Sequence, residues 1–424
     1  MTQVKNLKHV AFEWGARLLS FSYKEAAIQF LTFFSGLIVV RYLPKSDYAL
    51  YTLVVSMQAT TAVLADSGLS NGVSAIGGPM ADNRSKLNSL CDSANKIRLT
   101  LTLAVCVVMG PLLAYLLIKQ GATVCEAVIL CCIMMLSAHM QIAQSFYAQF
   151  VRLTLQIATL QKLNFKAALI RLSFIATSIS LIPGTATTAI ANGATLALQV
   201  CYLKKWRKEN FTEGRHNSID YKSKLFYYIK RQAPLSIYYC VYGQISVFLL
   251  GIFGTPNSVA DIGALGRFSL FYSLLASVMT NLIYPRFARI TNLNDLPRRY
   301  FQSAVFFVLV GSALPLAAEI NPRILLSILG SDYLHLQNEL TLMLLSALLG
   351  NLSGVLWSLN SARGWTVPAP ISIGYSIIIQ AVLIYFLDVS SLQGVISLSL
   401  YTAMASIGFC LVVAHRSKNS ISNS

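Results

Sequence analysis

Arg267 is the only formally charged residue in the apolar run from Leu265 to Tyr284. An arginine at the centre of a membrane helix costs about 2.5–3.5 kcal/mol on insertion scales. A chain that keeps one there must offset the cost with a water-filled cavity, an acidic partner or an anionic ligand. Arg267 is therefore the leading candidate for a substrate-binding residue. Its planar guanidinium can donate two parallel hydrogen bonds, which suits a phosphate group.

The opposing interpretation of Arg267 is a structural ion pair, for which Asp261 and Glu126 are the available acids. Asp261 lies six residues earlier and off the same helical face, so it is poorly placed for a local pair. Arg267 lies about eight residues from the outer end of its run, or about 12 Å along a helix. The half-thickness of the hydrocarbon core is about 15 Å. The side chain is thus expected near the midplane, and both interpretations stay open.

Other polar side chains in apolar stretches could line the same cavity. Tyr238 and Tyr242 are four residues apart and share one helical face, where they could stack on sugar rings or pack as core. The predicted substrate-binding set is Arg267, Tyr242, Tyr238, Gln244, Asn281, Gln29 and His139. His139 could instead form an interhelical hydrogen bond. Asp66 and Glu126 are candidates for coupling an ion, and a local pair is the alternative for Asp66.

The motifs of covalent chemistry are missing from the sequence. It has no GxxxxGK[ST] loop, no HExxH, no GxSxG and no Asp-x-Asp pair. Its eight cysteines include no CxxC pair, so neither a zinc site nor a disulfide framework is indicated. We therefore expect no catalytic residue, no cofactor and no metal, and transport without bond-making.

The composition indicates a polytopic membrane protein. Of 424 residues, 55% are hydrophobic and 12% are charged, whereas soluble proteins carry about 25% charged residues. A spanning helix needs about 20 mostly apolar residues. The apolar runs predict an all-α fold with about twelve transmembrane helices, at 23–43, 48–77, 98–118, 123–149, 164–182, 185–203, 231–252, 258–284, 300–320, 335–359, 366–387 and 391–414.

Lysine and arginine counts set the predicted orientation. With twelve spans and both termini cytoplasmic, 28 of the 33 basic residues lie inside, four lie outside and Arg267 lies in the membrane. The net charge of +17 is then explained by topology and by attraction to anionic membrane lipids, so no nucleic-acid partner is expected.

The longest inside loop follows six spans and precedes six more, which predicts two six-helix bundles. The predicted parts are a cytoplasmic segment at 1–22, an N-terminal bundle at 23–203, a basic cytoplasmic linker at 204–229, a C-terminal bundle at 230–414 and a cytoplasmic tail at 415–424. Such duplication is typical of secondary transporters, whose substrate path lies between the halves.

Four stretches carry a resemblance to a known family. They are VVRYLPKSDYALYTL (39–53), ADSGLSNG (65–72), DIGALGRFSLFYSL (261–274) followed by YPRFARI (284–290), and ILLSILGSDYLHL (324–336). In order and spacing they resemble the polysaccharide flippases of the multidrug/oligosaccharidyl-lipid/polysaccharide (MOP) exporter superfamily, in particular the Wzx-type O-antigen flippases.

The resemblance implies a MATE-like fold and alternating access in the bacterial inner membrane. It implies transfer of an undecaprenyl-pyrophosphate-linked oligosaccharide, as used for lipopolysaccharide, between leaflets. It also implies polymerase and chain-length machinery as pathway partners, and places Arg267 in the central cavity.

The main alternative is a multidrug antiporter of the same superfamily, and a second is a membrane glycosyltransferase or polymerase. Drug-exporting relatives often carry a buried carboxylate in helix 1 or helix 7. In this chain the first predicted span has no aspartate or glutamate after Glu25, and the seventh has none between Arg231 and Asp261. The absence of a large outside loop argues against the polymerase.

Overall fold

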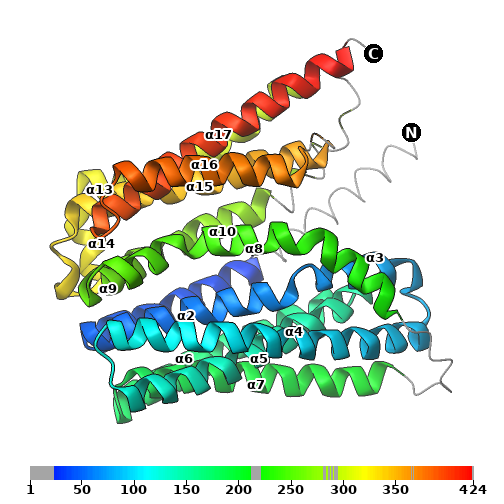
Figure 1. Ribbon diagram of the computed structural model, residues 1–424, viewed down its shortest axis with the longest axis horizontal. Helices are drawn as coiled ribbons and strands as arrows, with labels where there is room; N and C mark the ends of the chain where they lie inside the picture. The colour runs from blue at the N-terminus through cyan, green and yellow to red at the C-terminus, as the bar shows by residue number, and fades with distance from the viewer. Residues whose placement is uncertain are drawn as a thin grey trace, which may run out of the picture. The chain divides into compact units, whose positions relative to one another are not determined.

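The computed structural model describes residues 23–211, 221–279, 283–284, 287, 290, 295–363, 365 and 367–422. The described part is helical and contains no strand, as expected for an all-α membrane protein (Figure 1). By contacts the chain separates into two compact units, one made of residues 34–263 and the other of residues 1–33 and 264–424. The first boundary falls inside the helix Tyr23–Tyr42 and the second inside helix α9.

The 34–263 unit contains most of the long helices of the first half of the chain. They are α2 (Lys45–Asp66), α3 (Leu69–Gly77), the short helix η1 (Gly78–Met80), α4 (Arg84–Lys119), α5 (Val124–Leu153), α6 (Ile157–Leu181), α7 (Thr185–Asn210), α8 (Lys222–Phe253) and the first part of α9 (Pro256–Leu265). Helices α7 and α8 extend into the predicted linker 204–229 from both ends. The division into two six-helix bundles stays a prediction.

The 1–33 and 264–424 unit begins with the first part of helix Tyr23–Tyr42 and continues after α9. Its elements are η2 (Gly266–Phe268), α10 (Ser269–Val278), α12 (Leu296–Gly311), α13 (Ala313–Ile320), α14 (Pro322–Leu329), η4 (Ser331–Tyr333), α15 (Gln337–Ala362), α16 (Ala369–Phe386) and α17 (Leu392–Ser422). Helices α14 and η4 lie between the predicted spans 300–320 and 335–359, in a segment that the predicted topology places outside the membrane.

Within the described residues, nine helices are long and apolar enough to cross a membrane, and the bent helix α8 makes a tenth. Helices α6 and α7 lie at the other two of the twelve predicted positions but are less apolar. Three basic residues, Lys162, Lys166 and Arg171, interrupt the apolar face of α6. The protein is a multi-pass membrane protein.

Three predicted spans are interrupted in the structure. The span 48–77 divides after Asp66, because Ser67 and Gly68 take left-handed backbone conformations with φ of 38° and 88°. The span 258–284 is interrupted by the 3₁₀ turn η2. The span 300–320 divides at Ser312 into α12 and α13. Two of the interruptions coincide with small or polar residues, Ser67 and Gly68 in the first span and Ser312 in the third, whereas hydropathy gives no sign of η2.

The ADSGLSNG stretch is where α3 packs against α8. A Cβ atom at Gly68 would lie 2.6 Å from Cβ of Gln232, and one at Gly72 would lie 3.1 Å from Cβ of Tyr228. Asn71 donates a side-chain hydrogen bond to Gln232 on the same contact. Glycine at these two positions therefore permits the close approach, which anchors the start of α8 in the 34–263 unit.

An aromatic core holds α5 and α7 together in the same unit. The Phe150 ring packs edge-to-face on Phe146 and Phe211, with centroids 5.3 and 6.2 Å apart, and Phe211 meets Trp206 at 5.7 Å. The Trp206 indole N–H donates to Oε1 of Gln156 at 2.7 Å, which satisfies its polar group.

Candidate functional site

Arg267 lies in a 3₁₀ turn inside its span. Gly266, Arg267 and Phe268 form η2, a single 3₁₀ turn between α9 and α10, and the span runs on as one helix from Pro256 to Val278. A stretch of 3₁₀ helix within a longer helix often marks a functional position.

The helix Tyr23–Tyr42 packs against this turn. The Phe33 and Phe268 ring centroids are 6.5 Å apart, and Phe268 is buried. Gln29 lies four residues before Phe33 and so shares its helical face. Its side-chain amide donates to Oε1 of Glu25 at 3.4 Å. Gln29 and Arg267, both from the predicted set, thus belong to one unit and to neighbouring elements.

Tyr238 and Tyr242 are brought together as predicted. Their rings stack on α8 with centroids 6.2 Å apart and planes inclined by 21°. Tyr239 meets Tyr238 edge-to-face at 5.4 Å. Gln244 follows on the same helix, which bends by 47° between the segments Lys222–Cys240 and Tyr242–Phe253. The half-buried tyrosine pair is a flat aromatic surface of the kind that packs on a sugar ring or on a neighbouring helix.

The remaining members of the set are distributed differently. His139 is half-buried on α5. Close to it, Gln141 accepts a hydrogen bond from Gln58 of α2 at 2.7 Å, which links the two helices. Asn281 lies outside the described residues. The predicted set therefore divides between the two units, with Gln29 and Arg267 in one and Tyr238, Tyr242, Gln244 and His139 in the other.

The two acids predicted for ion coupling occupy helix ends. Asp66 ends α2, and its carboxylate accepts hydrogen bonds from the Ser70 backbone N–H at 3.2 Å and from the Ser70 hydroxyl at 2.5 Å. Glu126 stands in the first turn of α5, where Thr123 caps its backbone N–H at 3.3 Å. A carboxylate is favoured at a helix N-terminus by the helix dipole. Both acids thus have local structural roles in the described part of the chain.

Asp261, the acid considered as a partner for Arg267, forms an ion pair with Lys45. The Lys45 Nζ and Asp261 Oδ1 atoms are 2.8 Å apart, and the aspartate side chain is only 8% exposed. Two residues further on, a Cβ atom at Gly263 would lie 2.4 Å from Oγ1 of Thr52. Two of the stretches behind the family resemblance, 39–53 and 261–274, therefore meet where α9 packs on α2.

The structure adds a buried cation that the sequence did not single out. Arg98 is the first residue of the predicted span 98–118, but α4 begins earlier, at Arg84, and buries the Arg98 side chain at 3% exposure. Its guanidinium donates to Oδ1 of Asn95 at 2.9 and 3.0 Å and lies 5.6 Å from the Phe146 ring centroid. Asn83, which caps α4, is the sequence signal that could have located the earlier helix start. Arg171 lies near the centre of α6.

Among the described residues, no group of three histidine, cysteine, aspartate or glutamate side chains is placed to hold a metal ion. In one unit Arg267 offers a cation that can bind an anion, and in the other the tyrosine pair offers a flat surface that can pack on a ring.

Solved structures of membrane transporters share this fold. An inward-facing multidrug resistance MATE family transporter of the MOP superfamily aligns over 93% of this chain and 96% of its own, with a TM-score of 0.71 at 15% identity. The lipid II flippase MurJ in an inward closed conformation aligns over 94% and 87%, with a TM-score of 0.71 at 13% identity. A MOP superfamily transporter from Pyrococcus furiosus, whose binding pocket is described as having reversed polarity, has a TM-score of 0.62 at 13% identity and aligns over 95% and 93%.

No family model and no curated protein matches this sequence. The likenesses show that the chain has the helical fold common to MATE transporters and the MurJ flippase, as the all-α prediction expected. Its activity is a separate question, which the site residues address.

Proposed function

We propose that the protein is a flippase for an undecaprenyl-pyrophosphate-linked oligosaccharide, the repeat unit of O-antigen or a similar surface polysaccharide. It would carry this lipid from the inner to the outer leaflet of the bacterial inner membrane by alternating access. The observation that carries the proposal is Arg267, a cation in a 3₁₀ turn of an otherwise apolar span.

The guanidinium of Arg267 can hold a pyrophosphate through two parallel charge-assisted hydrogen bonds. Gln29, on the helix that packs against η2, can add a hydrogen bond to the same head group. The stacked Tyr238 and Tyr242 rings suit the apolar face of a sugar. A lipid tail needs no protein site, since it can stay in the bilayer during transfer.

A multidrug transporter is the alternative, and the likeness to MATE transporters favours it as much as the likeness to MurJ favours a flippase. The distribution of acids in the sequence favours the flippase. Helix α8 contains no aspartate or glutamate, and the helix Tyr23–Tyr42 contains only Glu25. An antiporter of cationic drugs needs an acid that exchanges protons or sodium for cargo, which these helices do not supply deep in the membrane.

Reconstitution tests the proposal directly. Purified protein in liposomes should expose an undecaprenyl-pyrophosphate-linked oligosaccharide, loaded in the inner leaflet, to an external lectin that cannot cross the bilayer. The mass of the lipid should stay unchanged, because no bond is made or broken. A lengthened glycan would indicate a polymerase. Ethidium movement without glycolipid movement would indicate a drug transporter and would overturn the proposal.

A further inference from the structure

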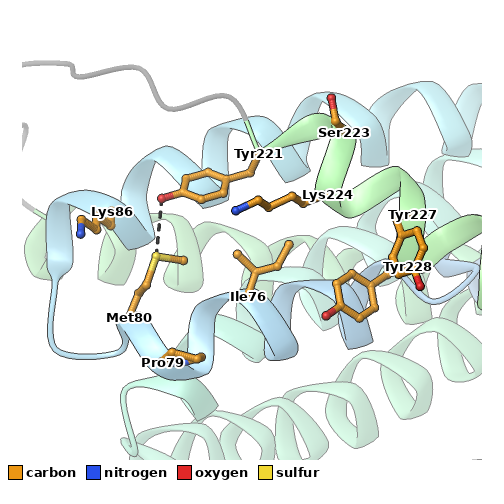
Figure 2. Close-up of a pocket in the computed structure, with 9 residues that line it drawn as sticks. All are labelled: Ile76, Pro79, Met80, Lys86, Tyr221, Ser223, Lys224, Tyr227 and Tyr228. Atoms are coloured by element: carbon orange, nitrogen blue, oxygen red, sulfur yellow. Dashed lines mark hydrogen bonds between the residues drawn. The ribbon is translucent and has the colours of Figure 1, made fainter.

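A basic and aromatic cavity lies in the 34–263 unit, and none of the residues that line it belongs to the predicted substrate-binding set. It has a volume of about 800 Å³ and opens between α3 and η1, the start of α4 and the start of α8 (Figure 2). Sites for small molecules are about 300–1,000 Å³. The residues that carry the argument are Ile76, Met80, Lys86, Tyr221, Lys224 and Tyr228.

The wall of this cavity is well packed. Tyr221 is 5% exposed, and its hydroxyl donates to Sδ of Met80 at 3.5 Å, which ties the start of α8 to η1. The close contact between Gly72 and Tyr228 holds α3 against α8 about two turns further along α8. Figure 2 shows the Lys224 ammonium directed into the space beside Tyr221, whereas Ser223 points away.

The two lysines of the cavity have no acidic partner in the described part of the chain. This distinguishes them from Lys45, which pairs with Asp261, and from Lys205, which lies 3.9 Å from Glu209. Lys86 and Lys224 also stand in the first turns of α4 and α8, where the helix dipole disfavours a positive charge. Two such cations among the residues that line one cavity favour the binding of an anion.

The residues that line the cavity indicate the chemical class of the molecule to which the anionic group belongs. Ile76, Pro79 and Met80 form an apolar side that a hydrocarbon chain can cover, and tyrosine is enriched where membrane proteins meet the head groups. The charge asymmetry of the sequence predicts that the starts of α4 and α8 face the cytoplasm. Basic pockets between membrane helices on that side suit acidic lipid head groups.

We propose that this cavity is a binding site for the phosphate of an anionic lipid in the inner leaflet, with Lys86 and Lys224 as its ligands. The lipid phosphate lies between the two ammonium groups, and its chain runs along Ile76 and Met80. The lipid is either a bilayer phospholipid or a phosphorylated polyprenol. The proposal does not depend on the cargo proposed above, because lipid retention is measured without transport.

Native mass spectrometry of the purified full chain, released from nanodiscs, tests the site. The probes are phosphatidylglycerol, phosphatidylcholine and undecaprenyl phosphate. We expect the wild type to retain phosphatidylglycerol in preference to phosphatidylcholine. The variant Lys86→Ala/Lys224→Ala should retain about twentyfold less, since each lysine near an acidic lipid contributes about fivefold in affinity.

Two control variants make the result specific. Lys204→Ala/Lys208→Ala removes the same charge from exposed positions at the end of α7 and should retain phosphatidylglycerol as the wild type does. Lys86→Arg/Lys224→Arg keeps both charges and should also retain it. Lys86 and Lys224 are both exposed, so their replacement by alanine or by arginine should not disturb folding. Size-exclusion profiles of the variants would check this.

Equal retention by the alanine variant and the wild type would overturn the proposal, as would equal retention of the two phospholipids. Undecaprenyl phosphate distinguishes the source of the phosphate. Displacement of phosphatidylglycerol at equal concentration assigns the site to a polyprenyl phosphate, and retention of phosphatidylglycerol assigns it to the bilayer.

Discussion

Lys45 and Asp261 form an ion pair across 216 residues of sequence, with Nζ and Oδ1 2.8 Å apart. Lys45 is the first residue of α2, and Asp261 lies in the middle of α9. The pair joins the two helices at the point where Gly263 touches Thr52. It therefore sets the position of α9, and η2 with Arg267 begins one residue after α9 ends.

The Lys45–Asp261 pair should contribute measurably to stability. Removing one partner leaves a largely buried charge, so Lys45→Met should destabilise the protein by about 2 kcal/mol, less than a fully buried pair because Lys45 is partly exposed. The double variant Lys45→Met/Asp261→Leu should recover most of the loss. Thermal unfolding in detergent would measure the cycle.

The control for this cycle is the exposed pair Lys205 and Glu209, 3.9 Å apart on one face of α7. Exposed pairs of this spacing contribute about 0.3–0.5 kcal/mol, so Lys205→Met should have little effect. If the Lys45 and Lys205 substitutions lowered stability equally, the 2.8 Å pair would contribute no more to stability than the exposed pair does.

The contact between Gly263 and Thr52 predicts a cost for any side chain at position 263. An alanine Cβ would lie 2.4 Å from Oγ1 of Thr52, which is buried and already donates to the Tyr48 carbonyl at 2.9 Å. Gly263→Ala should lower stability by about 1–3 kcal/mol through overpacking. Gly350→Ala on α15 is the matched control, because its Cβ meets nothing within 4 Å. It should be neutral or slightly stabilising.

Arg267 is expected to act on the cargo. Arg267→Ala should abolish surface-glycan export in cells while protein abundance and membrane insertion stay normal. Arg267→Lys should restore export in part, because the point charge remains but the bidentate fork is lost. Surface-glycan staining and quantitative immunoblotting of the membrane fraction provide the two measurements.

The structural interpretation of Arg267 predicts a different pattern. If the arginine only balances an acid, Arg267→Ala should lower abundance, and removal of that acid as well should restore it. Normal export by Arg267→Ala at normal abundance would exclude the residue from the mechanism.

The orientation of the chain is a prediction from charge alone. A topology reporter fused at His216, within the basic segment, should report a cytoplasmic location. A reporter fused at Asn257 should report a periplasmic location. Reporters that place both positions on one side would contradict the twelve-span topology.

Run lengths and composition were enough to predict the fold class and the approximate positions of the membrane helices. A chain in lipid must satisfy its backbone hydrogen bonds within each helix, so length and apolarity are enough to locate a span. The same local logic placed Tyr238 and Tyr242 on one face, because residues four apart meet on any helix. It also marked Arg267, since a lone charge in an apolar run is visible without a structure.

Which residues meet across the sequence depends on packing in three dimensions. The 3₁₀ turn at Arg267 lies inside an apolar run, so hydropathy does not register it. The interruption after Asp66 coincides with Ser67 and Gly68, whose left-handed backbone is seen only in the structure. The burial of Arg98 depends on Phe146 of another helix, and the partner of Asp261 is Lys45 rather than a residue on its own helix. These contacts depend on packing between distant segments, which local periodicity does not encode.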